Sequence, residues 1–319
     1  MPREYLKTAP KSARTDAADV SQTVSAMLSN IEQGGEDAAR RYASQLDGYD
    51  GPVLLSADAI AAACARVPQG LRDDITFARD NVRRFAEMQK QSVQDTHTEV
   101  VPGLIAGQKA IPCNAAGCYI PGGRYSHVAS AIMTVTTAKV AGVRHITACS
   151  PPRPGIGLPP AIIFAAHLCG ADSILAMGGV QGIAAMTFGL FGLPRADILA
   201  GPGNQYVAEA KRILYGRVGI DMVAGPTDSL ILADATADPH IVATDLVSQA
   251  EHGYNSPVWL VTNDRALAMD VARRVPALIA ALPPLNRDSA EAAWRDYAEI
   301  ILCDDREDMA ACSDAYAPE

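Results

Sequence analysis

Two side chains that could bind a metal ion, Gln249 and His252, lie three residues apart in the second half of the sequence. They end a segment that reads as a helix, opened by Asp238-Pro239 and closed by Gly253. At this spacing an amide oxygen and an imidazole nitrogen share one helical face and could bind one ion. A histidine in a last turn also suits the helix dipole. On spacing alone this second interpretation is favoured, because the pair supplies only half of a zinc site.

Three glycine-bearing loops offer a different chemistry, the binding of an anion such as a pyrophosphate. Each joins a predicted strand to a predicted helix, where free backbone N–H groups and the helix dipole attract negative charge. The loops contain Gly117–Gly123, Gly178-Gly179 and Gly201–Asn204. None has the GxGxxG spacing of a dinucleotide fingerprint. Tight turns explain these glycines as well as nucleotide binding does.

The elements that must position these residues follow a regular order between Gly117 and Pro226. Strands are expected at 117–120, 145–149, 173–177 and 197–199, and helices at about 127–141, 159–169, 181–190 and 205–215. A strand–loop–helix unit repeated in this way predicts a parallel sheet wound with helices on both faces. The expected fold class is therefore α/β.

The flanking sequence predicts helices on one side and further strand–helix units on the other. Residues 1 to about 95 carry apolar residues at helical spacing, with a break at Gly34-Gly35. A hairpin follows, because Pro102-Gly103 is a strong turn signal between short apolar runs. Beyond residue 226 we expect strands at 229–233, 258–261 and 299–302, and helices from 239, at about 264–281 and at about 305–315.

Composition limits the class of partner. The chain has 319 residues, 49% of them hydrophobic, with a formal net charge of -9 and a pI near 5.2. This balance argues against nucleic acid or an anionic membrane, so a small-molecule substrate is expected. Seven cysteines without a Cys-x-x-Cys pair indicate reduced thiols rather than disulfides. No signal core or long apolar stretch is present, which predicts a soluble, cytoplasmic protein.

Several motifs, taken together and in chain order, resemble the histidinol dehydrogenase family over nearly the whole chain. They are GCYIPGG at 117–123, GVQGIAA at 179–185, GPGN at 201–204, AGPT at 224–227, SQAEHG at 248–253 and YAPE at 316–319. The resemblance implies that Gln249 and His252 are two of four zinc ligands. The other two, an Asp and a His, follow later in the family than this sequence extends.

The same resemblance implies an NAD site, in which Tyr119, Gln181 and Asn204 contact the cofactor. It also implies two Rossmann-like, doubly wound parallel-sheet domains with an N-terminal helical segment. The first domain would comprise 1–116 and 226–319, and the second would be the insert 117–225; a further C-terminal segment of the family is absent. The family implies a homodimer with sites shared across the interface.

Two departures from the family pattern bear on the substrate. Histidinol dehydrogenases usually carry Ser-Glu where this chain has Thr227-Asp228, at the expected substrate contacts. Arg124 and His127 also stand where small or neutral residues are usual, and they could recognise an anionic head group. Alternatively, Arg124 is a surface charge and His127 an ordinary loop residue. A loop that recognises an anionic head group resembles the branch of the family that oxidises 2,3-dihydroxypropane-1-sulfonate to sulfolactate. Histidinol is the alternative substrate.

Glu319 ends the sequence and carries the last expected role. In the family this Glu activates water, and a His that follows at once acts as general acid and base. The sequence could thus be a fragment of a longer enzyme or a natural truncation, and a truncated chain should be inactive and bind metal weakly. The expected activity of the intact enzyme is zinc- and NAD-dependent oxidation of a primary alcohol to a carboxylate by two hydride transfers. The competing hypothesis is a scaffold or nucleotide-binding protein that has lost catalysis.

Overall fold

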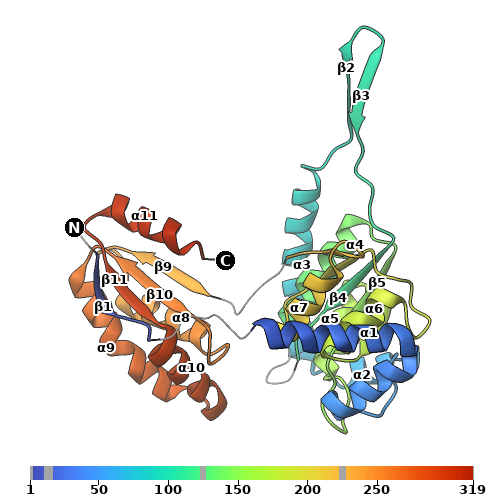
Figure 1. Ribbon diagram of the computed structural model, residues 1–319, viewed down its shortest axis with the longest axis horizontal. Coiled ribbons are helices and arrows are strands. Elements are labelled where there is room, and N and C mark those ends of the chain that lie inside the picture. Colours follow the sequence, from blue (N-terminus) through green and yellow to red (C-terminus); the bar gives the residue numbers. More distant parts are fainter. Residues whose placement is uncertain (1–2, 11–16, 123–126, 223–227, 319) are drawn as a thin grey trace. The chain divides into compact units, whose positions relative to one another are not determined.

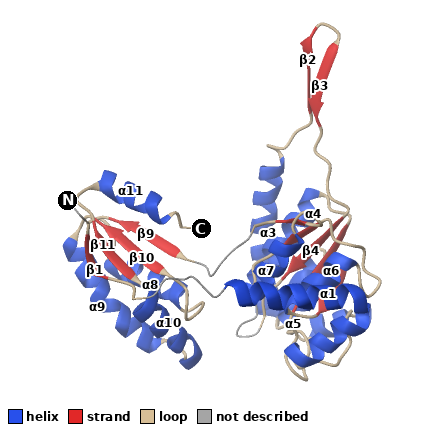
Figure 2. Cartoon of the chain, viewed as in Figure 1, coloured by secondary structure: helices blue, strands red, loops and turns tan. Residues whose placement is uncertain are grey.

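The computed structural model describes residues 3–10, 17–122, 127–222 and 228–318. The chain divides into two compact units (Figures 1 and 2). The central unit comprises Ala18–Val223, and the terminal unit comprises Met1–Ala17 together with Ala224–Glu319. The fold class is α/β, as the sequence predicts.

Among its described residues, the central unit contains a parallel five-stranded sheet in the order β6-β5-β4-β7-β8. The strands are β4 (Ala115–Tyr119), β5 (His145–Ser150), β6 (Ser173–Ala176), β7 (Ile198–Ala200) and β8 (Gly219–Ile220). The helices between them are α4 (Val128–Ala141), α5 (Pro160–Cys169), α6 (Gly179–Phe188) and α7 (Gln205–Leu214). Strand order reverses at β4, because β5 lies on one side of it and β7 on the other. Such a reversal opens a crevice at the carboxyl ends of the strands.

Both faces of this sheet are buried, which explains why its strands read as continuous small or apolar runs. On β4, Cys118 packs into one core with α4 and α5, whereas Tyr119 packs into the other with α6 and α7. On β6, Ile174 and Leu175 divide between the two cores in the same way. The alternation follows from the two-residue period of a strand and confirms the doubly wound arrangement.

The N-terminal helices cover the central sheet, and this corrects the expected grouping of 1–116 with 226–319. They are α1 (Ala17–Tyr42), α2 (Ala57–Ala65) and α3 (Gln69–Lys90), with a short π-helix, η1 (Ala43–Asp47), after α1. Val24 and Ile31 of α1 share a core with α6, while Ile75 of α3 lies in the core on the α4 face. Burial of both sheet faces requires these helices, and their local periodicity could not indicate which sheet they cover.

The break expected at Gly34-Gly35 is present as a kink within α1. Gly35 has φ 59° and ψ -142°, which is not helical. Glycine adopts a positive φ without the steric cost that a side chain would add.

A two-stranded hairpin follows α3, formed by β2 (Thr96–Val101) and β3 (Leu104–Gln108). Its turn is Pro102-Gly103, as predicted, and Gly103 N donates to the carboxylate of Glu99 at 2.7 Å. All residues of both strands are exposed. Figure 1 shows the hairpin projecting beyond the helices of the central unit.

The terminal unit contains a four-stranded sheet in the order β1-β11-β10-β9. The strands β9 (Ser229–Ala233), β10 (Val258–Thr262) and β11 (Glu299–Leu302) are parallel, and β1 (Glu4–Lys7) is antiparallel to β11. One face packs against α8 (Pro239–Ala250), α9 (Arg265–Ala281) and α10 (Pro284–Tyr297), and the other against α11 (Arg306–Tyr316). The sequence did not indicate β1 or α10. Within the described ranges, no helix is long and apolar enough to cross a membrane.

Candidate functional site

A cleft of about 630 Å³ lies in the central unit at the carboxyl ends of its strands. Residues that follow β4, β5, β6 and β7 line it, and α1 and η1 contribute the remaining wall. Tyr119, Gln181 and Asn204 all line this cleft. The structure therefore brings together three residues from separate loops at the point where strand order reverses. Open α/β sheets commonly bind ligands at this position.

Gln181, which lines this cleft, carries a buried acceptor atom. The residue is 1% exposed, and its Oε1 has no hydrogen-bond partner among the described residues. Its Nε2 donates to Oδ2 of Asp47 at 3.1 Å, which fixes the orientation of the amide. A buried acceptor without a donor is unfavourable by about 1–3 kcal/mol, so Oε1 is suited to accept a hydrogen bond from a ligand.

The first turn of α6 is already satisfied by the protein's own oxygens. Gly178 N donates to Oδ2 of Asp47 at 2.9 Å, and Gly179 N donates to the hydroxyl of Tyr119 at 3.0 Å. Burial raises the pKa of the Asp47 carboxyl, although the hydrogen bonds from Gly178 and Gln181 act in the opposite direction. Burial likewise raises the pKa of the Tyr119 hydroxyl, which therefore stays protonated at neutral pH. These two N–H groups are not available to a phosphate.

The loop after β7 is fixed by an ion pair between a buried lysine and an exposed aspartate, which sequence analysis did not identify. Lys211 is 3% exposed, pairs with the Asp221 carboxylate and donates to the carbonyl oxygen of Gly201 at 3.0 Å. Gly201 N in turn donates to Asp221 at 2.7 Å. Both backbone groups of Gly201 are thereby held. Asn204 caps α7, because its side chain accepts from Tyr206 N and Val207 N at 3.1 Å each.

Glycine is required at position 201 because the chain approaches β4 closely there. Gly201 has φ 118°, and a Cβ at this position would lie 2.0 Å from the carbonyl oxygen of Tyr119. The glycine loop thus sets the spacing between β4 and β7 at the cleft. Gly201 thus has a structural role, which is one of the two explanations that the sequence allowed for the glycine loops.

The charge of the cleft is low. Among the described lining residues, Asp47 alone has a charged side chain, and Pro121, Pro151, Pro152 and Pro154 provide rigid apolar surface. The described lining therefore offers a largely neutral, apolar surface that suits a flat ring of a ligand.

The expected metal ligands lie in the terminal unit, at the end of α8. Gln249 is in the last turn of this helix, and His252 is in the turn that follows it. His252 N donates to the carbonyl oxygen of Gln249 at 3.1 Å, so the two residues share one turn. The helix ends two residues before His252, slightly earlier than predicted. Within the described residues, no group of three or more His, Cys, Asp or Glu side chains is placed to hold a metal ion.

Asp228 lies at the same edge of the terminal sheet as this turn. It immediately precedes β9, whose first residue Ser229 pairs with Val258, the first residue of β10. The turn containing Gln249 and His252 leads into β10. Asp228, Gln249 and His252 therefore lie at one edge of the sheet, where the parallel strands β9 and β10 begin.

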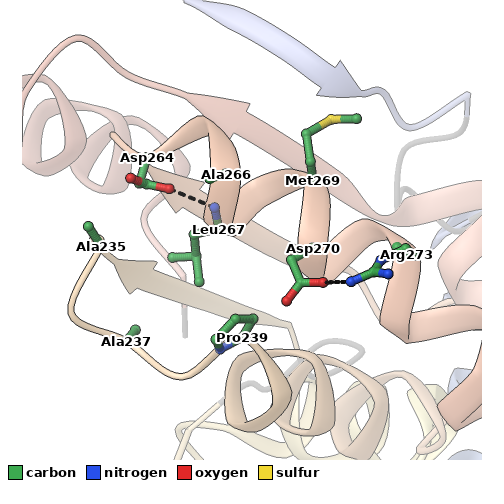
Figure 3. A pocket seen from close by; sticks show the side chains of 9 residues that line it. All are labelled: Ala235, Ala237, Pro239, Asp264, Ala266, Leu267, Met269, Asp270 and Arg273. Carbon is green, nitrogen blue, oxygen red and sulfur yellow. Dashed lines mark hydrogen bonds and ion pairs between the residues drawn. The ribbon is translucent and has the colours of Figure 1, made fainter.

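A separate surface hollow of about 760 Å³ lies at the opposite edge of the terminal sheet (Figure 3). Its charged groups interact with each other or with backbone, as Figure 3 shows. Asp264 accepts from Leu267 N at 2.6 Å as the cap of α9, and Asp270 pairs with Arg273 and Arg274. Because these groups are satisfied, we assign the hollow no chemistry.

Three of the expected site residues, Arg124, Thr227 and Glu319, lie outside the described residues. His127 is described: it immediately precedes α4, and its carbonyl oxygen accepts from Ser130 N at 3.1 Å. Gly122, the last described residue before Arg124, lines the central cleft.

Comparison with known proteins gives concordant matches. The family model for histidinol dehydrogenase matches residues 10–319. The chain is 70% identical over 316 residues to sulfopropanediol 3-dehydrogenase of Ruegeria pomeroyi, covering 99% of this chain and 73% of that protein. It is 34% identical over 317 residues to histidinol dehydrogenase of Parasynechococcus marenigrum, covering 99% and 72%. The crystal structure of histidinol dehydrogenase from Elizabethkingia anophelis superposes with a TM-score of 0.87 at 36% identity, covering 98% and 71%.

The doubly wound sheets, the cleft at the reversal of strand order and these matches define the class of protein. It is an oxidoreductase, a dehydrogenase that acts on a small-molecule substrate. The chain belongs to the histidinol dehydrogenase family. The family resemblance inferred from the motifs is confirmed, and so is the resemblance to its sulfopropanediol branch.

We expect Gly201→Ala to destabilise the central unit by more than about 3 kcal/mol, because the new Cβ meets backbone in a left-handed conformation. Gly216→Ala is the matched control, since Gly216 has φ 94° and no atom within 4 Å of a Cβ. It should cost only about 1–2 kcal/mol of strain. Urea unfolding followed by circular dichroism gives both values. Equal losses would show that the contact with Tyr119 is unimportant.

Proposed function

We propose that this protein is a zinc- and NAD-dependent dehydrogenase that oxidises (R)-2,3-dihydroxypropane-1-sulfonate to the corresponding carboxylate, sulfolactate. The supporting observation is the 70% identity to a sulfopropanediol 3-dehydrogenase, about twice the 34% identity to a histidinol dehydrogenase. The matches extend across the central cleft and the turn at the end of α8.

The central cleft supports the assignment of NAD. Tyr119, Gln181 and Asn204 line it at the reversal of strand order, and Gln181 presents an acceptor without a partner among the described residues. The proline-rich wall would cover a flat ring. Since no cation lines the described part of the cleft, an additional phosphate such as that of NADP finds no counter-charge there.

The turn at the end of α8 supports the assignment of zinc. Gln249 and His252 supply a neutral oxygen and a neutral nitrogen, both of which bind this ion. Asn286 donates to the carboxylate of Glu251 at 2.8 Å and so holds the turn that carries Gln249 and His252. These residues would supply two ligands, and the family pattern places an Asp and a His beyond Glu319 as the others.

The bound groups would supply Lewis acidity toward the alcohol oxygen and a hydride acceptor. The residues of this chain would bind and orient the substrate. Arg124 and His127 would hold the sulfonate by charge-assisted hydrogen bonds, and Thr227 and Asp228 would bind the hydroxyl groups. Glu319 would accept a proton from the water that adds to the aldehyde before the second oxidation.

Histidinol is the second candidate substrate, since proteins named histidinol dehydrogenase share 34% and 37% identity with the chain. A catalytically inactive family member is the third interpretation. Retention of Gln249, His252 and the cleft residues favours an active enzyme over an inactive scaffold.

We also infer a homodimer, supported by apolar surface on the central unit. On α3, Phe77, Phe85 and Met88 are 69%, 56% and 56% exposed, and the hairpin exposes Val100 and Ile105. A two-stranded hairpin without a packed face is marginally stable in water, and contiguous apolar surface commonly marks an interface. A second copy of the chain would cover both features.

The activity is tested with the full-length protein, zinc and NAD, using dihydroxypropanesulfonate and histidinol in parallel. We expect turnover of the sulfonate with two NADH per substrate, because alcohol to acid requires two hydride transfers. Arg124→Met should raise KM by about tenfold or more with a smaller effect on kcat, since the substrate loses a charged contact.

Turnover of histidinol alone would contradict the substrate assignment while leaving the family assignment intact. Bound zinc per chain, measured in the same preparation, separates an active enzyme from a metal-free scaffold. His252→Ala should lower the zinc content, whereas His240→Ala, a control in the first turn of α8, should not.

The dimer is tested by light scattering on the full-length protein. Ile105→Asp places a charge on the exposed hairpin and should shift the mass from dimer toward monomer. Ile156→Asp, at a residue that is 78% exposed elsewhere in the central unit, should leave it unchanged. A monomeric parent protein, or identical masses for both variants, would contradict the proposed interface.

A further inference from the structure

We propose that Asp47 is a positioning residue of the cofactor site, which acts through Gln181 and directs the donor groups of the nucleotide, not its phosphates, to the start of α6. The inference rests on the proposed function, because it concerns how the central cleft receives NAD. It adds a residue from η1 that none of the sequence motifs contains.

The first observation is that one oxygen of Asp47 holds two donors. Its Oδ2 accepts from Gln181 Nε2 at 3.1 Å and from Gly178 N at 2.9 Å. An amide whose nitrogen is held in this way must turn its oxygen in the other direction. Asp47 therefore determines which end of the Gln181 amide is presented to the ligand.

The oxygen end of the Gln181 amide is buried beside the cleft. Gln181 Oε1 has no partner in the part of the chain that the structure describes, and a Cβ at position 179 would lie only 3.1 Å from it. Gly179 and Gln181 both line the cleft. Because residue 179 has no side chain, Oε1 is not covered from that direction. The acceptor is thus buried, oriented and adjacent to the cleft.

The start of α6 has no backbone N–H group at Gly178 or Gly179 left for a phosphate. In many nucleotide sites the first N–H groups of such a helix bind phosphate. Here Gly178 N donates to Asp47 and Gly179 N donates to Tyr119. The Asp47 carboxylate also repels a phosphate at close range. The start of α6 is therefore unsuited to the pyrophosphate of a dinucleotide.

A dinucleotide carries neutral donors that fit such an acceptor: the carboxamide of nicotinamide, the amino group of adenine and the ribose hydroxyls. A hydrogen bond from any of these would satisfy Gln181 Oε1. The role of Asp47 is indirect, because it fixes the acceptor and need not touch the ligand.

The test is a fluorescence titration of NADH into the full-length protein, without substrate. Asp47→Ala should raise the Kd about tenfold, because the Gln181 amide loses its fixed orientation. Asp47→Asn should stay within about twofold, since the amide oxygen can accept both donors that now bind Oδ2. Asp50→Ala is the matched control, an exposed aspartate three residues further on, and should bind NADH like the parent protein.

A double-mutant cycle distinguishes positioning from a general loss of structure. In a Gln181→Ala background, Asp47→Ala should raise the Kd for NADH by less than about twofold, because Asp47 then has no amide to orient. Asp47→Ser replaces Asp47→Ala if the latter does not fold, and thermal unfolding of every variant identifies misfolding.

Two negative results have separate meanings. If the parent protein does not bind NADH, the proposed cofactor is wrong. If the parent binds NADH but Asp47→Ala binds equally well, or if the effects of the two alanine substitutions multiply, the positioning role of Asp47 is overturned.

Discussion

The reversal of strand order between β4 and β7 is the constraint on which the central unit depends. Helices α4 and α7 leave these two neighbouring strands toward opposite faces of the sheet, so neither of them covers the crevice between the carboxyl ends of the strands. Gly201 keeps the two strand ends close, and the ion pair between the buried Lys211 and Asp221 holds the N–H and the carbonyl of that glycine. Tyr119 and Asn204 are brought to one cleft by this geometry. Neither residue belongs to a linear dinucleotide motif.

Asp47 extends this geometry to the N-terminal helices. Although it lies 134 residues from Gln181 in the sequence, it holds both that side chain and the first N–H of α6. Burial of the carboxylate is unfavourable and raises its pKa, and the hydrogen bonds from Gly178 and Gln181 offset part of that cost. The helical N-terminal segment therefore does more than cover the sheet, because it contributes to the wall and the polarity of the cleft.

Local pattern predicted the elements well and their long-range grouping poorly. The strands at 229–233 and 299–302 match the prediction because each is a compact apolar run. Helix α10 escaped prediction because its buried face consists of small or polar residues such as Asn286, Ser289 and Ala290. Strand β1 is short and half polar. No local sequence pattern indicated Asp47 or Lys211, because their roles depend on partners that are distant in the sequence. Tyr119, Gln181 and Asn204 were selected from the family motifs, which do not depend on knowing those contacts.

The proposed cofactor site is the cleft of the central unit, and hydrogen exchange with and without NADH tests this assignment most directly. Amide exchange reports local opening of the backbone, which a bound ligand slows. We expect slower exchange in peptides that cover 119–122, 179–182 and 203–207, and no change in the hairpin at 96–108. Protection confined to the hollow around Ala235 and Arg273, with none in the central cleft, would contradict it.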